Sequence, residues 1–438
     1  MLIYKSQFNH EVKLPDSEDI ICFNFRSHYF ARLNRLQKYL FDMAPFDSVP
    51  SGFLGELYEK GILVEGDEKE RLKKEINQKR KDDNVFHLTI FTNMQCNFEC
   101  EYCLETGQIN QSGMSLETEL GIISFVEYYI RNFDIKKMEI IWFGGEPLLS
   151  TEIIERISKE LIRLADDNSV KYEAVIYTNG YGLSEKNIRL LERCRVGTIR
   201  ISLDGIGYLN DKYRHLKNGN GTYDRIINNI KSTKTNIVYR VRCNLNKENY
   251  MYYEDMVESF RCLEKESGNR IICSPERLKV EEHVPKQFSE IELSIDEYLR
   301  IYGGVKDCLV REEDSDAYSI CHSLKYACPS CGEYGFFVDV AGNIYKCAWA
   351  PKDKDSQIIA NVNEFNGTFA NTEVIDFYLK YTFPDKAKCN ACKILPICLG
   401  KCPLNVLEAE KYTCRRYLNE LDWVVLKLYN KYLQKQDS

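Results

Sequence analysis

Residues Phe91 to Gly107 read FTNMQCNFECEYCLETG and include Cys96, Cys100 and Cys103. These cysteines form a C-x3-C-x2-C pattern directly after an apolar stretch, His87 to Phe91, that is predicted to be a strand. Three thiols this close in the chain can converge on one metal centre without help from distant parts of the fold. The stretch therefore predicts a metal-binding loop that follows a strand.

The number of thiols separates two kinds of metal centre. A cubane 4Fe-4S cluster has four irons to ligate, so three thiolates leave one iron open for a small molecule. Structural zinc usually takes a closed set of four ligands in paired C-x2-C units. No fourth cysteine lies nearby, and the nearest histidine, His87, belongs to the preceding apolar stretch. The spacing favours an iron-sulfur cluster with an open iron, with zinc or buried thiols as the alternatives.

With the aromatic residue Tyr102 before its last cysteine, the triad resembles the cluster loop of the radical S-adenosylmethionine (SAM) enzymes. In that family the amino and carboxylate groups of SAM chelate the open iron. The resemblance implies that one electron from the cluster cleaves SAM to methionine and a 5'-deoxyadenosyl radical. That radical removes a hydrogen from an unactivated carbon, so the cofactors carry the difficult chemistry.

Length, charge and cysteine usage set further expectations. The chain has 438 residues, longer than one typical domain, and its 44% hydrophobic share suffices for sizeable cores. A net charge of -7 with mixed signs gives no basic face for nucleic acid. The start of the chain lacks a secretory pattern, and no apolar run reaches the length of a membrane span. With 18 cysteines, we expect a cytoplasmic protein whose clustered thiols bind metal rather than form disulfides.

The N-terminal part of the chain is predicted to be a small α+β domain. Asn9 to Arg35 alternates like a small sheet, and Gly52 to Val64 reads as a short helix followed by a hydrophobic edge. This order is similar to the winged-helix recognition domains of peptide-modifying enzymes, with a simple cap on the main domain as the alternative. Glu65 to Asp83 is rich in charge and is predicted to be a solvated linker helix. The predicted domains are residues 1–84, 85–310 and 311–438.

Strand-like and helix-like stretches then alternate from Val85 to about Leu278. This predicts a parallel sheet with helices outside, either an open doubly wound sheet or a partial barrel. The predicted strands are His87–Phe91, Met138–Phe143, Glu173–Tyr177, Thr198–Leu203, Ile237–Leu245 and Arg270–Ser274. The predicted helices are Leu116–Arg131, Thr151–Asp166, Ser184–Cys194, Tyr223–Thr233 and Tyr252–Glu264. Together with the resemblance, the expected fold class is α/β, a partial (β/α)6 radical SAM barrel.

Motifs at the carboxyl ends of these strands, where such folds bind ligands, predict a SAM pocket. Paired glycines let a ligand approach the backbone, a carboxylate can accept from an ammonium, and an arginine fork suits a carboxylate. By resemblance, the GGEP motif holds the SAM amino group, and Ser202 and Arg214 contact its ribose and carboxylate. The alternative is a structural role for each of these residues. Taken alone, the GGEP motif is typical of a turn and Arg214 of a surface cation, and Arg242 and Asn244 would belong to a buried hydrogen-bond network. The expected cofactor-binding residues are Tyr102, Gly144, Gly145, Glu146, Pro147, Asn179, Ser202, Asp204, Arg214 and Arg242.

The last third of the chain is rich in cysteine. After a predicted helix start at Ser294 and Glu297, which have capping-box spacing, the run from Cys328 to Cys347 predicts a hairpin around Ala341-Gly342-Asn343. Eight cysteines could ligate two complete clusters, and two zinc ribbons are the alternative. The arrangement resembles the SPASM extension of radical SAM enzymes, which carries two auxiliary 4Fe-4S clusters. The resemblance gives the first cluster Cys328, Cys331, Cys347 and Cys402 and the second Cys389, Cys392, Cys398 and Cys414, while Cys321 competes with Cys331.

Enzymes with this extension resemble one another in acting largely on peptides and proteins. We therefore expect a maturase that forms a thioether or carbon-carbon crosslink in a ribosomally made precursor peptide. Its partners would be that peptide, with its leader bound by the N-terminal domain, and a flavodoxin- or ferredoxin-type reductant. No catalytic residue is identified from the sequence.

Three other functions remain open. A sulfatase maturase, which oxidises Cys or Ser to formylglycine, is similar in all three clusters. Such enzymes typically carry Asp after the cysteine that matches Cys347, and Ala348 stands here. A non-catalytic iron-sulfur electron carrier would need no SAM pocket, and a zinc-stabilised peptide-binding module would hold no iron.

Overall fold

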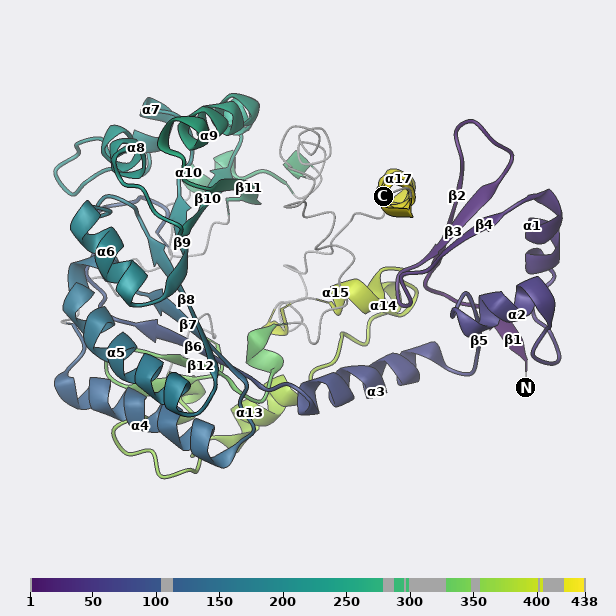
Figure 1. Cartoon of the computed structure of the whole chain (residues 1–438), viewed down its shortest axis with the longest axis horizontal. Helices are drawn as coiled ribbons and strands as arrows, with labels where there is room; N and C mark the ends of the chain where they lie inside the picture. Colours follow the sequence, from purple (N-terminus) through teal and green to yellow (C-terminus); the bar gives the residue numbers. More distant parts are fainter. Residues whose placement is uncertain are drawn as a thin grey trace. The chain divides into compact units, whose positions relative to one another are not determined.

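A computed structural model describes residues 2–103, 113–278, 287–294, 297–298, 328–347, 355–400, 402–404 and 421–436. The chain forms two compact units (Figure 1). The first unit comprises Met1–Asp83, Glu312–Glu333 and Tyr378–Ser438, and the second comprises Asn84–Arg311 and Tyr334–Phe377. Two of the unit boundaries lie close to the predicted domain boundaries, whereas the last predicted domain is shared between the units. The three-domain division stays a prediction.

Within its described residues, the second unit contains a nine-stranded sheet with the order β11-β10-β9-β8-β7-β6-β12-β13-β14. Strands β6 to β11 are parallel neighbours in chain order. Their bounds are β6 (Val85–Phe91), β7 (Lys137–Phe143), β8 (Lys171–Thr178), β9 (Val196–Ser202), β10 (Val238–Leu245) and β11 (Ile271–Arg277). The predicted strands of the core are therefore confirmed, with ends shifted by a few residues.

Strands β6 to β11 follow chain order without the reversal of a doubly wound sheet, so that alternative is wrong. The helices of this unit lie outside the sheet, as Figure 1 shows. The long helices are α4 (Leu116–Asn132), α5 (Thr151–Asp167), α6 (Glu185–Arg193), α8 (Tyr223–Ser232) and α9 (Tyr253–Ser267). Alternate strand residues such as Ile140, Trp142 and Ile176 are fully buried in the core. No helix of the described ranges has both the length and the apolarity to cross a membrane.

The predicted C-terminal hairpin is confirmed and extends this same sheet. It consists of β12 (Gly335–Val338) and β13 (Asn343–Tyr345), which are antiparallel, and β14 (Ala360–Asn361) follows them. Strand β12 pairs in parallel with β6, on the side away from β7. Phe336 anchors it, with its ring centroid 5.9 Å from that of Phe86 and 5.3 Å from that of Phe125. The sequence did not indicate this pairing.

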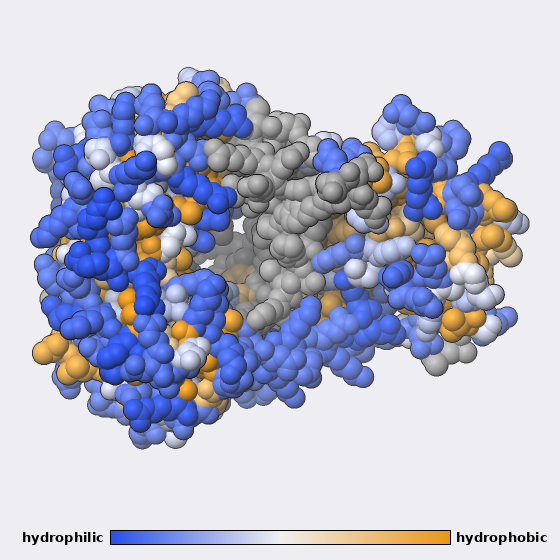
Figure 2. Space-filling model, viewed as in Figure 1, coloured by the Kyte–Doolittle hydropathy of each residue, from blue (hydrophilic) through white to orange (hydrophobic). Residues whose placement is uncertain are grey.

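The N-terminal part of the first unit is a small sheet with helices, as predicted. Strands β2 (Asn9–Lys13), β3 (Ile20–Asn24) and β4 (Phe30–Leu33) are antiparallel, and β1 (Ile3–Lys5) pairs with β5 (Leu63–Glu65). One face of the larger sheet packs on α1 (Arg35–Asp42) and α2 (Gly52–Glu59). The other face packs on the C-terminal helix α17 (Leu421–Gln436). Figure 2 shows apolar residues gathered over the N-terminal part, at the right of the view.

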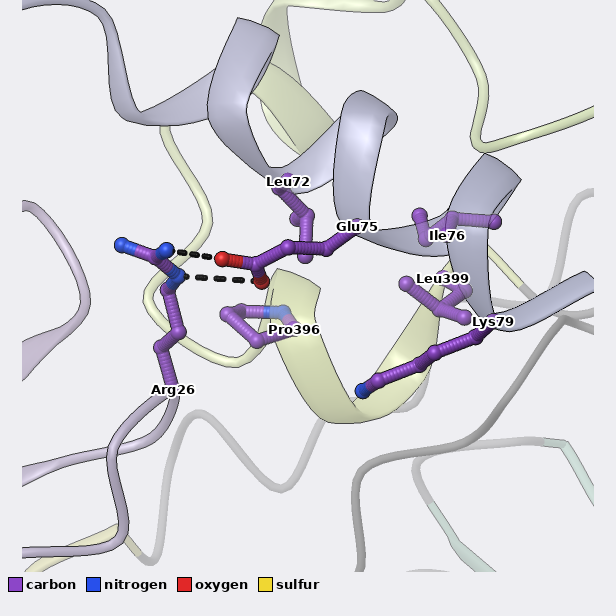
Figure 3. A pocket seen from close by; sticks show the side chains of 7 residues that line it. All are labelled: Arg26, Leu72, Glu75, Ile76, Lys79, Pro396 and Leu399. Atoms are coloured by element: carbon purple, nitrogen blue, oxygen red, sulfur yellow. Dashed lines mark hydrogen bonds and ion pairs between the residues drawn. The ribbon is translucent and has the colours of Figure 1, made fainter. Parts of the chain in front are cut away.

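Helix α3 (Glu68–Lys81) differs from its prediction as a solvated linker. Leu72 and Ile76 are buried and pack with Leu395 and Leu399, next to α15 (Leu395–Cys398). Figure 3 shows Arg26 paired with Glu75 of α3 beside a cavity of about 20 Å³, enough for a single water. The helix is thus part of the core of the first unit, and this cavity is too small for a cofactor.

Candidate functional site

The cysteine loop follows β6 and is fixed at both of its sides within the second unit. The backbone N–H of Thr92 donates to the carbonyl of Phe143 at 3.0 Å, next to the end of β7. Farther along the loop, the N–H of Glu99 donates to the carbonyl of His215 at 3.0 Å, and that of Lys217 to the carbonyl of Asn97 at 3.3 Å. These bonds fix the part of the loop around Cys96 between the end of β7 and the segment that follows Arg214, and Cys100 and Cys103 come directly after it.

The three thiols of the loop lie within electrostatic reach of one another. Burial raises the pKa of Cys100 to about 12 and also raises that of Cys96, and the charge of Cys103 adds to both shifts. Arg214 acts in the opposite direction on both groups. Because iron binds thiolates, cluster assembly must release these protons, and the nearby guanidinium favours that release.

The donor set fits a 4Fe-4S cluster better than a single ion. In the described part of the chain, no three Cys, His, Asp or Glu side chains stand close enough to hold one metal ion. A cubane cluster presents a different iron to each thiolate, so its ligands lie farther apart than the ligands of a single ion. Cys96, Cys100 and Cys103 would hold such a cluster and leave its fourth iron without a protein ligand.

The paired glycines of the GGEP turn allow two backbones to meet. A Cβ atom on Gly144, whose φ is +135°, would lie 2.2 Å from the carbonyl oxygen of Asn93. One on Gly145 would lie 2.3 Å from the carbonyl oxygen of Gln95. The N–H groups of Gly145 and Glu146 donate to these same two carbonyls, at 3.0 and 2.8 Å. The glycines therefore dock the turn onto the start of the cysteine loop, a role that the sequence did not reveal.

The Glu146 side chain is buried and bonded within the protein. Its Oε1 accepts from the N–H of Leu148 at 3.0 Å and from Thr178 Oγ1 at 2.6 Å, and its Oε2 accepts from the N–H of Asn179 at 2.6 Å. Burial raises the pKa of this carboxyl, and the three donors oppose that shift. Next to it, Pro147 is buried and begins the short helix η1 (Pro147–Ser150). The carboxylate thus joins the GGEP turn to the end of β8.

Two further predicted residues border the cysteine loop and the neighbouring strand ends. Asn179 donates from Nδ2 to Asn97 Oδ1 at 2.8 Å, and the same nitrogen lies 3.9 Å from Cys96 Sγ. Ser202, at the end of β9, is in register with Arg242 of β10. The structure therefore places both residues at the carboxyl ends of their strands, as predicted.

Tyr102, Asp204 and Arg214 form one hydrogen-bonded group. The Tyr102 hydroxyl donates to the Asp204 carboxylate and accepts from Arg214 Nη1 at 3.0 Å. Asn244 Nδ2 donates to the other oxygen of Asp204 at 3.0 Å, and Arg242 Nε donates to Asn244 Oδ1 at 3.0 Å. Burial raises the pKa of Tyr102, which keeps its hydroxyl protonated as a donor. The network joins the cysteine loop to the ends of β9 and β10.

Three asparagines that the sequence analysis missed support the site. Asn93 donates from Nδ2 to the carbonyl of Glu146 at 3.0 Å. Asn249 donates to the carbonyl of Asp204 at 2.6 Å, and Asn210 accepts from the Asp204 N–H at 3.3 Å. Asparagine is common in turns, so its presence after a strand carried little signal.

Most of the C-terminal cysteines lie in the first unit. Cys328 precedes the short helix η3 (Pro329–Cys331) and Cys331 ends it. Cys389 lies in α14 (Ala387–Asn390), Cys398 ends α15, and Cys392 and Cys402 lie in the segments that follow these two helices. Cys347 follows β13 in the second unit. Cys321, Cys414 and Ala348 lie outside the described residues. The two auxiliary ligand sets therefore remain proposals.

One tyrosine marks where four of these thiols gather. Burial raises the pKa of Tyr381, and the charges of four cysteines add to that shift: Cys331, Cys389, Cys398 and Cys402. The Tyr381 hydroxyl is buried and has no hydrogen-bond partner among the described residues. A polar group of this kind beside four thiols fits a site that holds iron-sulfur clusters.

Comparison with known proteins agrees with this geometry. Residues 89–260 match the family model described as Radical SAM superfamily. These residues form a radical SAM domain. It contains the cysteine loop, the GGEP turn and the Asp204 network. Radical SAM proteins are enzymes that use a 4Fe-4S cluster and SAM, so the non-catalytic carrier is the weaker alternative.

Several relatives share more than the radical SAM domain. The chain is 22% identical over 399 residues to the radical SAM cyclopropyl synthase TigE of Paramaledivibacter caminithermalis, covering 84% of this chain and 79% of the relative. It is 22% identical over 328 residues to the cysteine-type anaerobic sulfatase-maturating enzyme of Clostridium novyi, covering 71% and 85%. The solved structure of native anSMEcpe with bound AdoMet and Cp18Cys peptide has a TM-score of 0.58 and 15% identity, covering 81% of this chain and 99% of that one. The fold of this chain is thus that of radical SAM enzymes.

Proposed function

We propose that this enzyme is a radical SAM peptide maturase that installs an intramolecular crosslink, a thioether or a carbon-carbon bond, in a ribosomally made precursor peptide. The similarity to TigE spans most of both chains and so extends beyond the radical SAM domain. It supports an enzyme that acts on a substrate other than SAM itself. The observation that carries the proposal is an exposed apolar surface on the N-terminal sheet-and-helix part.

That surface is a stripe along α1. Leu36, Tyr39, Leu40 and Met43 are spaced i, i+3, i+4 and i+7, and they are 67%, 65%, 36% and 58% exposed. Helix α1 directly follows β4, which is an edge strand of its sheet among the described residues. An edge strand beside an apolar helix suits an extended peptide that adds a strand and places alternate side chains on the helix. We therefore assign the leader of the precursor to β4 and α1.

The proposed chemistry assigns separate roles to the residues of the site. When bound, the cluster and SAM supply the 5'-deoxyadenosyl radical that removes a hydrogen from the peptide. Cys96, Cys100 and Cys103 ligate the cluster, and the GGEP turn lies against their loop. Arg214 and Ser202 orient the carboxylate and ribose of SAM, and Tyr102 fixes Arg214 through a 3.0 Å hydrogen bond.

Two auxiliary clusters complete the proposed electron path. The cysteines assigned to them would hold clusters that can accept the electron that a substrate radical loses when a crosslink closes, since joining two atoms removes two hydrogens. A flavodoxin- or ferredoxin-type protein would reduce the first cluster. Clustered thiolates of this kind persist in a reducing compartment, so we place the enzyme in the cytoplasm.

A sulfatase maturase is the second candidate, because relatives of that class resemble the chain in sequence and fold. In that reaction a Cys side chain becomes an aldehyde and loses its sulfur, whereas a crosslink keeps all heavy atoms. Ala348 stands where such enzymes typically have Asp. This residue counts against formylglycine formation.

The experiment that tests the proposal starts with anaerobic reconstitution of the full chain. About twelve irons per chain are expected for three cubane clusters. With SAM and dithionite the enzyme should release 5'-deoxyadenosine, and replacing Cys96, Cys100 and Cys103 with Ala should abolish this while leaving two clusters. Retained cleavage, or zinc in place of iron, would exclude the assignment.

The choice between crosslink and aldehyde needs peptides encoded near the gene. Incubation with each candidate, followed by mass spectrometry, should show loss of two hydrogens and no aldehyde. An aldehyde that reacts with a hydrazide would instead identify a sulfatase-type maturase. As a control for the leader site, Leu36→Ser with Tyr39→Ser should weaken precursor binding and leave SAM cleavage unchanged.

A further inference from the structure

The face of the sheet opposite the helices carries a continuous row of aromatic and cationic side chains. Strand registers pair Phe91 with Phe143, Tyr177 with Arg200, and Arg200 with Arg240. Residues on either side of each member in its strand, such as Ile176, Ile199 and Val241, are buried under the helices. Because side chains alternate along a strand, the row points away from the helix layer.

The aromatic part of the row is in close contact. The ring centroids of Phe91 and Phe143 are 5.1 Å apart, and those of Phe143 and Tyr177 are 5.4 Å apart. The Arg200 guanidinium lies 5.1 Å from the centroid of Tyr177, and its Nη1 donates to the Tyr177 hydroxyl at 2.6 Å. Two contacts to one tyrosine hold the guanidinium in place and leave other N–H donors of Arg200 available.

Charged side chains are paired elsewhere on this face of the sheet but not in the row. At the amino ends of the strands, Glu139 Oε2 lies 2.8 Å from His87 Nδ1, and Lys137 Nζ lies 2.8 Å from Glu173 Oε2. In the row itself, Arg200 of β9 and its register partner Arg240, near the start of β10, are exposed and make no ion pair with any described residue. Like charges directly opposite each other on paired strands are destabilising, so an anion at this position would relieve their repulsion.

The row lies directly before the residues of the candidate site. Phe143 precedes Gly144, Tyr177 precedes Thr178, and Arg200 is two residues before Ser202. A ligand held on the row would therefore lie next to the proposed SAM pocket, where a hydrogen can be removed from it. Arg242, which the SAM pocket would use, is one pair farther along β10 and is not part of this row.

We propose that Arg200, which lies over the ring of Tyr177, and its register partner Arg240 bind a carboxylate side chain of the peptide substrate. The enzyme is then selective for a modified segment that contains Asp or Glu close to the reacting carbon. Arg200 supplies the oriented fork and Arg240 the second positive charge, while the aromatic rings pack against the aliphatic part of the acidic side chain. This inference rests on the proposed function and adds the chemical class of the segment that is modified.

The test uses binding, so it does not depend on turnover. Two synthetic hexapeptides, one with a central Glu and one with Gln in its place, are titrated into the reconstituted, SAM-bound enzyme by calorimetry. The Glu peptide should bind about tenfold more tightly, because a charge-assisted pair replaces a neutral contact. The double variant R200Q/R240Q should bind both peptides equally. Equal binding of the two peptides by the unaltered enzyme, or a preference that persists in the variant, would overturn the proposal.

Two controls separate this inference from the proposed function. Arg225 also lies over a tyrosine, 5.9 Å from the centroid of Tyr181, but outside the row, so R225Q should keep the preference for Glu. SAM affinity and uncoupled SAM cleavage should be unchanged in R200Q/R240Q, whereas a loss of SAM affinity would assign the arginines to SAM and overturn the proposal. Titration with N-acetylglutamate amide provides the last comparison. If this compound binds and its binding depends on the two arginines, while neither peptide binds, the carboxylate site stands and the proposed action on peptides fails.

Discussion

The hydroxyl of Tyr102 donates a hydrogen bond to the carboxylate of Asp204, and so connects the cysteine loop to the end of β9. A buried hydrogen bond to a charged group contributes about 1.5–3 kcal/mol to stability. Tyr102→Phe should lower the free energy of unfolding by about that amount, because the carboxylate loses a donor and stays buried. Chemical denaturation of the metal-free protein under anaerobic conditions measures this change.

Tyr213→Phe is the matched control, since Tyr213 belongs to the same aromatic cluster. Its hydroxyl donates to Glu248, whose side chain is 39% exposed, so the loss should be below about 1 kcal/mol. Equal losses in the two variants would show that the Tyr102 bond has no special weight.

The contact between Gly145 and Gln95 predicts a steric effect on the cluster. An alanine at Gly145 must move the cysteine loop, because its Cβ would lie 2.3 Å from the Gln95 carbonyl oxygen. Such overpacking costs about 1–3 kcal/mol, so Gly145→Ala should lower iron content and 5'-deoxyadenosine formation several-fold. Gly197→Ala is the control, because a Cβ there meets nothing within 4 Å. Normal iron content in the Gly145 variant would contradict the packing argument.

Glu139 predicts how stability depends on acid. Its hydrogen bond to His87, together with the nearby Lys137, lowers its pKa from the ordinary value of 4.5 to about 2. Because the folded pKa is the lower one, the ionised carboxylate stabilises the fold above pH 4.5, and this contribution is lost as the pH falls towards 2. The midpoint of thermal unfolding should therefore fall less steeply over this range in Glu139→Gln than in the unaltered protein.

The control for this slope is Glu160→Gln, which removes a carboxylate that pairs with Arg163 on the surface of α5. Its pH dependence should match that of the unaltered protein. Glu173 also faces Lys137, and it is unchanged in both variants. If all three proteins have the same slope, the His87–Glu139 pair does not contribute to acid sensitivity.

Tyr381 predicts a change in redox potential if the auxiliary clusters bind as proposed. Hydrogen bonds to cluster sulfurs favour the reduced, more negative state, and the Tyr381 hydroxyl is a buried donor beside four thiols. Tyr381→Phe should shift the potential of an auxiliary cluster to a more negative value, measured by redox titration with paramagnetic resonance. Tyr172→Phe, which removes a buried hydroxyl in the other unit, should leave it unchanged. Unchanged potentials at full iron content in the Tyr381 variant would disprove this role.

Local patterns were sufficient to predict most elements of the core. Strands such as β7 alternate strictly, and helix starts carry capping residues. Ser294 and Glu297 exchange hydrogen bonds at 2.7 and 3.2 Å, as their spacing predicted. The burial of α3 was missed, because Leu72 and Ile76 are diluted by charged neighbours and the surface they cover comes from the far end of the chain. No local pattern encodes a partner so distant in sequence.

The candidate site was predictable to a similar extent. Motif residues such as Glu146, Asn179 and Asp204 lie where the strand order placed them. Their bonding was not predictable, since the sequence cannot show that Glu146 already accepts three hydrogen bonds from the chain. The row formed by Phe143, Tyr177 and Arg200 was missed for a related reason. Its members come from three strands and become neighbours only through the register.

The pairing of β12 with β6 has a consequence for how the enzyme can be divided. If the chain ended near residue 310, β6 would lose its neighbour and expose the backbone donors and acceptors of an apolar strand. Such a bare edge recruits strands from other molecules, so the shortened protein would self-associate rather than stay monomeric. The hairpin of the cysteine-rich region thus shields the backbone of β6, which would otherwise be an exposed edge strand of the radical SAM sheet. The segment that matches the family model, residues 89–260, leaves out the strand that covers this edge of β6.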